Sequence, residues 1–383
     1  MLHRRRFLSR AGLAVGALVT PGLALAAAPT DRRLVFIVLR GAMDGLAAVM
    51  PVGDPAYAAL RVRFGPPPAA GPAIALNSDF ALHPALAATR ALYAKGQAAF
   101  VHAIASPYRE RSHFDAQNVL ETGGTAAYAL KDGWLNRLLP LLPRAQEPAV
   151  ALSATLPMAL RGAAPATAFA PSSLPEADDD LLARVGGMYD TDPQLHALWS
   201  QAMAARAMAG SDAQGRADPA TLGRLAATFL AKPDGARVAV IEIGGWDTHS
   251  GQVGRLNQQL RQLDAVIAAL ATGLGADWAR TIVVAATEFG RTAAPNGTGG
   301  TDHGTGGAAI LAGGALRGGR VITDWPGLAP ARLHDGRDLK PTADLRALFA
   351  GLAAEQFGLD PALVARTVFA GQSVVPMTGL VRV

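Results

Sequence analysis

The chain has 383 residues, with 35 lysines and arginines, 30 aspartates and glutamates, and no cysteine. The lack of cysteine excludes disulfides, thiolate metal sites and cysteine nucleophiles. Four arginines in the first 26 residues (Arg4, Arg5, Arg6 and Arg10) account for most of the formal net charge of +5, which falls to +1 without them. No basic stripe then remains to indicate a nucleic-acid partner.

The beginning of the chain has the pattern of an export signal. An Arg-Arg-Arg-Phe-Leu run at residues 4–8 precedes an apolar stretch over residues 11–28, and residues 24–26 form an Ala-Leu-Ala cleavage site. The twin arginine followed by Phe-Leu matches the signal that the Tat translocase reads. An uncleaved membrane anchor is the alternative, but the interrupted apolar run is marginal for a span. We predict a Tat signal over residues 1–26 and a periplasmic or secreted protein with one α/β domain over residues 27–383.

The signal can be tested by replacing the arginine pair. The double substitution Arg4→Lys and Arg5→Lys is expected to leave unprocessed precursor in the cytoplasm, because the Tat receptor reads the two arginines. Cell fractionation followed by immunoblotting measures the processed and unprocessed forms. Normal periplasmic maturation of the double variant would refute the Tat signal.

The first predicted elements of the domain are two buried strands. Residues 33–39 form an apolar run that ends in a short loop with Arg40, Asp44 and two glycines. Asp44 could ligate a metal ion, or it could simply precede a glycine in a turn. Residues 98–104 form the second apolar run, and His102 inside it is expected in the core.

A polar segment over residues 106–117 follows the second strand directly. It places Arg109, Arg111, Ser112, His113 and Asp115 at the start of a helix, where free amides and the helix dipole favour anions. Ser112 and Asp115 have capping-box spacing, so Ser112 alone is expected to be a cap and not a nucleophile. The whole cluster favours an anionic ligand.

The strand–helix rhythm is lost over residues 149–232. We interpret residues 150–235, approximately, as a helical insertion or cap over the edge of the sheet. Its predicted helices cover residues 181–209 and 219–232. The expected packing face consists of Met188, Leu195, Trp199 and Met203.

Another apolar run, residues 237–243, leads to a loop with Asp247, Thr248 and His249. An Asp-x-His pair in a loop can chelate one metal ion through an oxygen and an imidazole. The alternative is that Asp247 caps the helix that begins near residue 252. A second Asp-His pair, Asp302 and His303, makes metal ligation or acid/base chemistry the preferred interpretation.

The run over residues 281–287 is the clearest predicted strand, because it is continuous, apolar and β-branched. Glu288 and Arg291 follow at its carboxyl end, and a glycine-rich loop leads on to Asp302 and His303. Glu288 and Arg291 could instead form a structural ion pair, and Asp302 could cap a turn.

These runs predict a doubly wound, mostly parallel α/β sheet with helices on both faces. The strands near 34–39, 98–104, 237–243 and 281–287 are expected to point the same way, so the loops after them meet at one edge. The side chains expected to converge there are Arg40, Asp44, Ser112, His113, Asp247, His249, Glu288, Arg291, Asp302 and His303.

Five motifs, at residues 38–45, 112–117, 245–249, 287–292 and 301–304, together with the twin arginine, resemble the exported family of domain of unknown function 1501 (DUF1501). That family resembles the alkaline phosphatase and sulfatase superfamily, which implies a doubly wound α/β fold with metal sites at strand ends. The resemblance puts Asp44, Asp247, His249 and His303 near metal-ligand positions. It puts Glu288-Phe289 where the superfamily has an Asp-His pair, so one imidazole is missing.

The resemblance implies an exported hydrolase of phosphate or sulfate esters that uses a divalent metal (zinc, manganese or calcium) and no nucleotide cofactor. The expected partner is a small anionic or ester substrate. The predicted site comprises catalytic Ser112, His113 and Arg291, substrate-binding Arg40, Arg109 and Thr248, and metal ligands Asp44, Asp247, His249, Glu288, Asp302 and His303. The alternative is a non-catalytic periplasmic binding protein on a degenerate fold. A metal-free serine hydrolase using Ser112, His249 and Asp247 is least favoured, because no G-x-S-x-G elbow occurs.

Overall fold

The structure is a computed structural model that describes residues 31–65, 71–142, 148–171, 179–209, 218–369 and 373–382. The predicted signal over residues 1–26 lies outside these ranges. Within them, no helix combines the length and the hydropathy that a membrane span requires.

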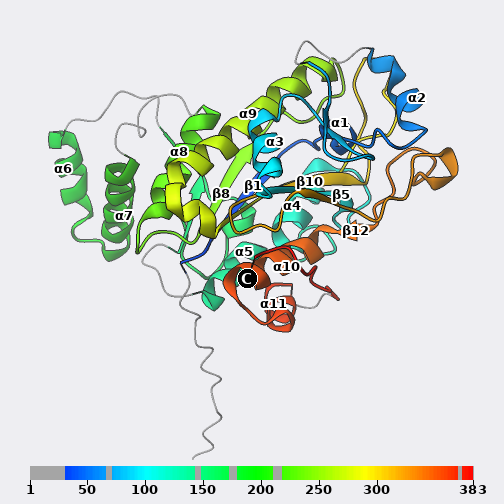
Figure 1. Ribbon diagram of the computed structural model, residues 1–383. Helices are drawn as coiled ribbons and strands as arrows, with labels where there is room; N and C mark the ends of the chain where they lie inside the picture. Colours follow the sequence, from blue (N-terminus) through cyan, green and yellow to red (C-terminus); the bar gives the residue numbers. More distant parts are fainter. Residues whose placement is uncertain are drawn as a thin grey trace, which may run out of the picture.

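A nine-stranded sheet forms the centre of the molecule, with the order β11-β5-β10-β9-β1-β8-β6-β7 and β12 paired with β5 (Figure 1). Its strands are β1 (Arg33–Leu39), β5 (Ala98–Ala105), β6 (Ala149–Leu152), β7 (Thr167–Ala168), β8 (Val238–Ile243), β9 (Thr281–Thr287), β10 (Gly307–Ala312), β11 (Arg320–Ile322) and β12 (Ala343–Asp344). A smaller sheet of order β2-β4-β3 is formed by β2 (Val49–Met50), β3 (Ile74–Ala75) and β4 (Ala81–Leu82).

Some of the helices cover the two faces of the large sheet, and others lie at its periphery (Figure 1). The helices are α1 (Gly45–Ala48), α2 (Tyr57–Arg61), α3 (Ala87–Ala94), α4 (His113–Thr122), α5 (Trp134–Leu138), α6 (Asp179–Tyr189), α7 (Pro193–Ala209), α8 (Pro219–Ala231), α9 (Gln252–Leu274), α10 (Leu345–Phe357) and α11 (Pro361–Val368). Short 3-10 turns are η2 (Val62–Phe64), η3 (Leu139–Leu141), η4 (Met158–Leu160), η6 (Gly275–Arg280) and η7 (Pro330–Arg332).

The alternation of side chains along β1 explains why both faces are covered. Val35 and Ile37 pack into a cluster with residues of α3, α8 and α9, whereas Phe36 and Val38 pack into a second cluster with residues of α5, α10 and α11. Every residue of β1 and of β9 is buried. A strand buried on both faces has an uninterrupted apolar sequence, which is the pattern that the sequence showed.

The predicted strand directions are confirmed. β1 pairs parallel with β8 and with β9. β10 runs antiparallel to β9 and to β5, so β5 points the same way as β9. The sheet is therefore mixed but mostly parallel. The ends of β1, β5, β8 and β9 lie at one edge, with the reversed strand β10 between β5 and β9.

The predicted insertion over residues 150–235 needs correction at its start and in its packing. β6 and β7 are strands of the main sheet, because β6 pairs parallel with β8 and β7 pairs with β6. Helices α6 and α7 lie at the periphery of the molecule (Figure 1). Met188 is 74% exposed and Leu195 is 42% exposed, so neither belongs to a buried packing face.

Candidate metal centre

Three imidazoles and a carboxylate from three loops meet at the carboxyl edge of the sheet. His113 begins α4, Asp247 and His249 lie in the loop after β8, and His303 lies in the loop between β9 and β10. Adjacent strands β8, β1 and β9 bring the loops that follow them together. The predicted convergence therefore holds for these four side chains.

A hydrogen bond to Glu288 fixes the orientation of the His113 ring. Its Nδ1 lies 2.7 Å from Oε1 of Glu288, a fully buried carboxylate that also accepts hydrogen bonds from the Gly41 amide at 2.9 Å and from Gln117 Nε2 at 3.1 Å. Since a carboxylate only accepts, the Nδ1–H of His113 donates. The other nitrogen, Nε2, lies 3.4 Å from Asp247 Oδ2. It is buried and has no hydrogen-bond partner.

His303 is held in the same way by a backbone carbonyl. Its Nδ1 lies 2.9 Å from the carbonyl oxygen of Arg111, so Nδ1–H donates here too. Its Nε2 lies 3.4 Å from Asp247 Oδ1. The lone pair of Nε2 is therefore directed at the same carboxylate as that of His113.

His249 is the third imidazole, and Asp302 holds it. Its Nδ1 lies 3.0 Å from Asp302 Oδ1, which also accepts from Asn296 Nδ2 at 3.0 Å. Its Nε2 lies 3.0 Å from Asp247 Oδ1 and 2.9 Å from His303 Nε2. The His249 side chain is 45% exposed and forms the open side of the cluster.

The donor set fits a divalent metal ion. All three Nδ1 atoms donate, so each Nε2 carries a lone pair. The Nε2 lone pairs of His249 and His303 face each other and the Asp247 carboxylate. Only a proton or a cation between these groups removes the repulsion. Ligand atoms of His113, Asp247 and His303 all lie within 4.8 Å of one another. Four ligands at zinc distances around a tetrahedral ion are about 3.3 Å apart. His113 Nε2 lies 3.4 Å from Oδ2 of Asp247 and His303 Nε2 lies 3.4 Å from Oδ1, so each imidazole has that separation from a different oxygen of the carboxylate.

Arg291 positions Asp247 and does not reach into the cluster. Its side chain is fully buried, and its Nη1 lies 2.7 Å from Asp247 Oδ1. Its Nε donates to Thr301 Oγ1 at 3.1 Å, and its Nη2 donates to the carbonyl of Thr301. Burial raises the pKa of Asp247, but the hydrogen bond and charge of Arg291, together with the charges of His249 and His113, outweigh it and the net shift is downward. These contacts indicate a positioning role for Arg291, and its predicted catalytic role stays a prediction.

Glu288 and Asp302 lie behind imidazoles. Both were predicted as metal ligands, but their oxygens face the Nδ1 atoms of His113 and His249. Burial raises the pKa of Glu288, yet the hydrogen bonds from His113 and its other donors lower it overall. Carboxylates that hold the far nitrogen of an imidazole fix its tautomer and ring orientation. Glu288 and Asp302 therefore orient imidazoles in this structure, and metal ligation by either carboxylate stays a prediction.

Asp44 forms a buried ion pair instead of a metal site. Its two oxygens lie 2.5 and 3.1 Å from the two terminal nitrogens of Arg61, and Gln252 Nε2 donates to it at 2.6 Å. Gln252 Oε1 in turn accepts from Thr301 Oγ1 at 2.5 Å, so Asp44 belongs to the network that supports Arg291. Its predicted role as a metal ligand stays a prediction.

The three side chains that were predicted to bind substrate make contacts with neighbouring protein groups. Arg40 pairs with Glu121 at 2.9 Å and with Glu242. Arg109 donates to the backbone carbonyls of Ser106 and Tyr108. Thr248 is fully buried and donates to Gln252. These contacts support the structure around the site and leave the three side chains no direct part in the cluster.

Ser112 occupies the predicted N-cap position of α4, but its side chain makes no capping hydrogen bond. Its amide donates to Tyr108 Oη at 3.3 Å. Tyr108 Oη also donates to Asp115 at 3.3 Å, which replaces the predicted capping box. The contacts of Ser112 are with Tyr108 and not with the imidazoles, so its predicted role as a nucleophile has no support.

Several supporting residues were missed from the sequence. Arg61 lies in α2, outside the motifs, and no local signal pairs it with Asp44. Gln117 lies one helical turn after His113, a spacing that puts both on one face of α4. The hydrogen bond from His303 to the Arg111 carbonyl could not be predicted, because a backbone group is the same in every residue type.

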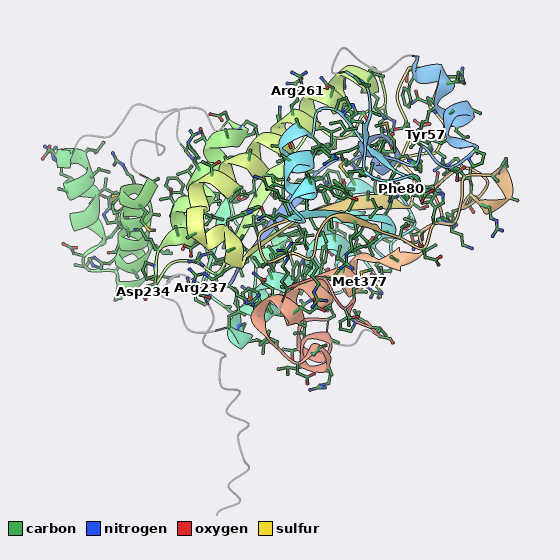
Figure 2. All side chains as sticks on the ribbon, viewed as in Figure 1. Tyr57, Phe80, Asp234, Arg237, Arg261 and Met377 are labelled. Carbon is green, nitrogen blue, oxygen red and sulfur yellow. The ribbon has the colours of Figure 1, made fainter. Side chains whose placement is uncertain are left out.

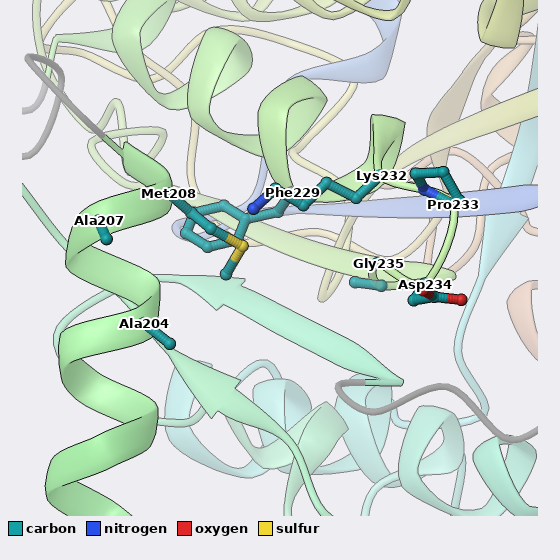
Figure 3. Close-up of a pocket in the computed structure, with 9 residues that line it drawn as sticks. Ala204, Ala207, Met208, Phe229, Lys232, Pro233, Asp234 and Gly235 are labelled. Carbon is teal, nitrogen blue, oxygen red and sulfur yellow. The ribbon is translucent and has the colours of Figure 1, made fainter.

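A cavity of about 670 Å³ lies elsewhere, between α7 and the segment before β8 (Figure 3). Its lining includes Met208, Phe229, Lys232 and Asp234 but no imidazole. Asp234 and Arg237 mark this side of the molecule in Figure 2, and Tyr57 lies on the other side. Because the lining precedes β8, the cavity is at the amino end of that strand and is separate from the cluster.

We expect two imidazoles of the metal-free protein to titrate on opposite sides of the ordinary pKa of 6.5. The hydrogen bond with Glu288 raises the pKa of His113 against the effect of burial, whereas burial lowers the pKa of His303. Because the folded pKa of His113 is raised, its protonation stabilises the fold fully below about pH 6.5. That stabilisation is lost as the pH rises through the folded pKa.

An NMR titration of the imidazoles checks this prediction. Glu288→Gln removes the charge that faces His113 and should lower the pKa of His113. His83 is the internal control, because burial and the charge of Arg261 lower its pKa to about 4 and Glu288 has no part in that shift. An unchanged pKa of His113 in the variant would contradict the assignment.

The fold and the cluster define an α/β protein with an imidazole–carboxylate centre at the carboxyl edge of a mostly parallel sheet. Residues 31–368 match the family model described as "Protein of unknown function (DUF1501)". The chain therefore belongs to the DUF1501 family, as its motifs indicated. A comparison with curated proteins finds no match.

Among solved structures, the chain is similar to the C-terminal periplasmic domain of EcEptC from Escherichia coli, with 10% identity and a TM-score of 0.41 over 91% of this chain and 89% of that one. The phosphonate monoester hydrolase of Agrobacterium radiobacter gives 11% identity and a TM-score of 0.35 over 90% and 79%. The lipoteichoic acid synthase LtaP from Listeria monocytogenes gives 10% and 0.35 over 70% and 58%. At such low scores, what these proteins act on is no guide to this chain.

Proposed function

We propose that the protein is an exported hydrolase of phosphate or sulfate esters that uses one divalent metal ion held by His113, Asp247 and His303. The observation that carries the proposal is the orientation of the imidazoles. Each is fixed through Nδ1, and each directs Nε2 at Asp247. The twin-arginine sequence supports export, and the motif resemblance supports the ester class.

The ligand set favours zinc or manganese over calcium. Two imidazole nitrogens and one carboxylate are typical of catalytic zinc sites, in which three protein ligands leave a position open. Calcium takes six to eight oxygen ligands, which the donors here do not offer. When bound, the cation would supply a Lewis acid that polarises an ester oxygen.

His249 is the proposed proton acceptor. Asp302 holds its Nδ1–H, so the lone pair that can take a proton is on Nε2, which faces Asp247 Oδ1 and His303 Nε2. Its exposure is greater than that of His113 or His303, which suits a group that exchanges protons with substrate and solvent. The Asp302 carboxylate stabilises the imidazolium that results.

One ion is proposed, because two other carboxylates that were predicted as metal ligands make different contacts. Asp44 is paired with Arg61, and Oε1 of Glu288 accepts from three donors. The same observation favours the second candidate, a binding protein that kept the crevice and lost catalytic metal chemistry. The two candidates differ in one measurable property: the hydrolase hydrolyses esters when a metal ion is bound, and the binding protein does not.

Hydrolysis of p-nitrophenyl phosphate, bis-p-nitrophenyl phosphate and p-nitrophenyl sulfate by the zinc- or manganese-loaded protein distinguishes them. Turnover that falls with His249→Ala but not with His196→Ala supports the hydrolase, since His196 is an exposed imidazole of α7. Metal binding without any turnover would support the binding protein. If the protein binds neither zinc nor manganese, the proposal of a metal-dependent hydrolase is wrong.

A further inference from the structure

We propose that Arg111 is a positioning residue for the metal centre, and that its ion pair with Asp338 fixes the tautomer and orientation of His303. The inference rests on the proposed function in so far as the fixed imidazole is a metal ligand. It concerns a contact that no motif in the sequence indicates.

The backbone of Arg111 has a conformation that L-residues rarely adopt. Its φ is +62°, in the left-handed region. Arg111 lies one residue before the N-cap of α4. Its left-handed backbone turns its carbonyl toward His303 Nδ1, which is 2.9 Å from the carbonyl oxygen. Such backbone strain persists only where the surroundings hold the residue in place, and it concentrates at functional sites.

The side chain of Arg111 supplies that hold. Its Nη2 lies 2.8 Å from Oδ2 of Asp338, which is fully buried, and 3.2 Å from Oδ2 of Asp335, which is 64% exposed. The Asp338 backbone forms a bridge with Thr292. The guanidinium therefore ties the loop before α4 to the polypeptide that carries the cluster.

The segment around His303 is tied to the same framework. Arg291 and His303 form a backbone bridge next to the one between Thr292 and Asp338. Asp338 therefore holds both groups in place. It pairs with the side chain of Arg111, and its backbone bridges to Thr292, next to the bridge that holds His303. Without the ion pair, the loop before α4 is free to relax from the left-handed conformation and withdraw the carbonyl.

Loss of the carbonyl has a defined chemical result. A neutral imidazole without an acceptor at Nδ1 also populates the tautomer with the proton on Nε2, and that tautomer cannot ligate a metal through Nε2. Mutation of such supporting groups lowers metal affinity about 10- to 100-fold. We expect Arg111→Ala and Asp338→Asn each to weaken zinc binding by about tenfold or more.

Zinc titration calorimetry measures this loss, with Asp335→Asn as the matched control. Asp335 contacts the same guanidinium from the exposed side, so its replacement should change the affinity by about twofold or less. Equal affinities for wild type, Arg111→Ala and Asp338→Asn would overturn the proposal. The two substitutions break the pair from opposite sides, so a folding defect in one leaves the other to decide. Asp338 also pairs with Arg337, which donates to the His303 carbonyl, so Arg337→Ala is measured beside Asp338→Asn and should weaken zinc binding less than Arg111→Ala does.

A second readout needs no metal. Nitrogen-15 NMR of the metal-free protein reports which nitrogen of His303 carries the proton. We expect the Nδ1–H tautomer in the wild type and in Asp335→Asn, and a mixture in Arg111→Ala. An unchanged tautomer in Arg111→Ala would overturn the proposal. If the wild type binds no zinc, the proposed function fails, but this comparison still decides the role of Arg111.

Discussion

Replacing His303 by alanine, or Asp247 by asparagine, is expected to lower the affinity for zinc by more than about a hundredfold. The reason is that each substitution removes a direct donor, whereas loss of a supporting group alone costs about 10- to 100-fold. Asp247→Asn keeps the size of the side chain and an oxygen that can accept from Arg291, so the buried guanidinium retains a partner. Titration calorimetry on the purified protein gives both affinities.

The matched control for this experiment is His196→Ala. His196 lies in α7 and pairs with Asp190 at the surface, away from the loops that form the cluster. Its loss should leave zinc affinity unchanged. Wild-type affinity in both His303→Ala and Asp247→Asn would show that the imidazole cluster is not the metal site.

Replacing Arg61 by alanine is expected to reduce the free energy of unfolding by about 3–5 kcal/mol, which is the usual cost of removing one partner of a buried ion pair. The substitution leaves the Asp44 carboxylate buried, with Gln252 and the Ala47 amide as its donors. Urea denaturation followed by circular dichroism measures the difference. The result bears on the site, because Asp44 and Gln252 support the network behind Arg291.

Two further variants make that measurement specific. Arg184→Ala breaks an exposed pair with Asp180 on α6 and should cost no more than about 1 kcal/mol. The double variant Asp44→Asn with Arg61→Met removes both charges, so it should be more stable than Arg61→Ala alone. An Arg61→Ala protein as stable as Arg184→Ala would mean that Asp44 is not held by the pair.

The fold was largely predictable because its central strands are buried on both faces. Continuous apolar runs identify β1, β5, β8 and β9, and the connections between them imply a common direction. The reversed direction of β10 could not be predicted, since an apolar run has no polarity of its own. The short strands β6 and β7 were assigned to the insertion because the strand–helix rhythm is lost after residue 149.

The location of the site was predictable, but the roles of its carboxylates were not. Position at a strand end puts Asp247, Glu288 and Asp302 in the right region. Whether an oxygen faces Nε2 or Nδ1 of an imidazole depends on loop geometry and on buried partners such as the Gly41 amide, which supplies a hydrogen bond to Glu288. The ion pair of Asp44 could not be predicted, because its partner Arg61 lies in a separate helix with no motif.

The exposed helices α6 and α7 show a different limit of sequence patterns. Spacing predicted a packing face for them, yet Met188 and Leu195 are exposed. Apolar spacing establishes that two side chains share a face of a helix, but not that the face is covered.

The most direct test of the central claim is a crystal of the wild-type protein grown with zinc, with diffraction recorded above and below the zinc absorption edge. We predict one anomalous peak within bonding distance of His113 Nε2, His303 Nε2 and an Asp247 oxygen. A zinc peak between Asp44 and Glu288, or no peak near the imidazoles at saturating zinc, would contradict the proposed centre.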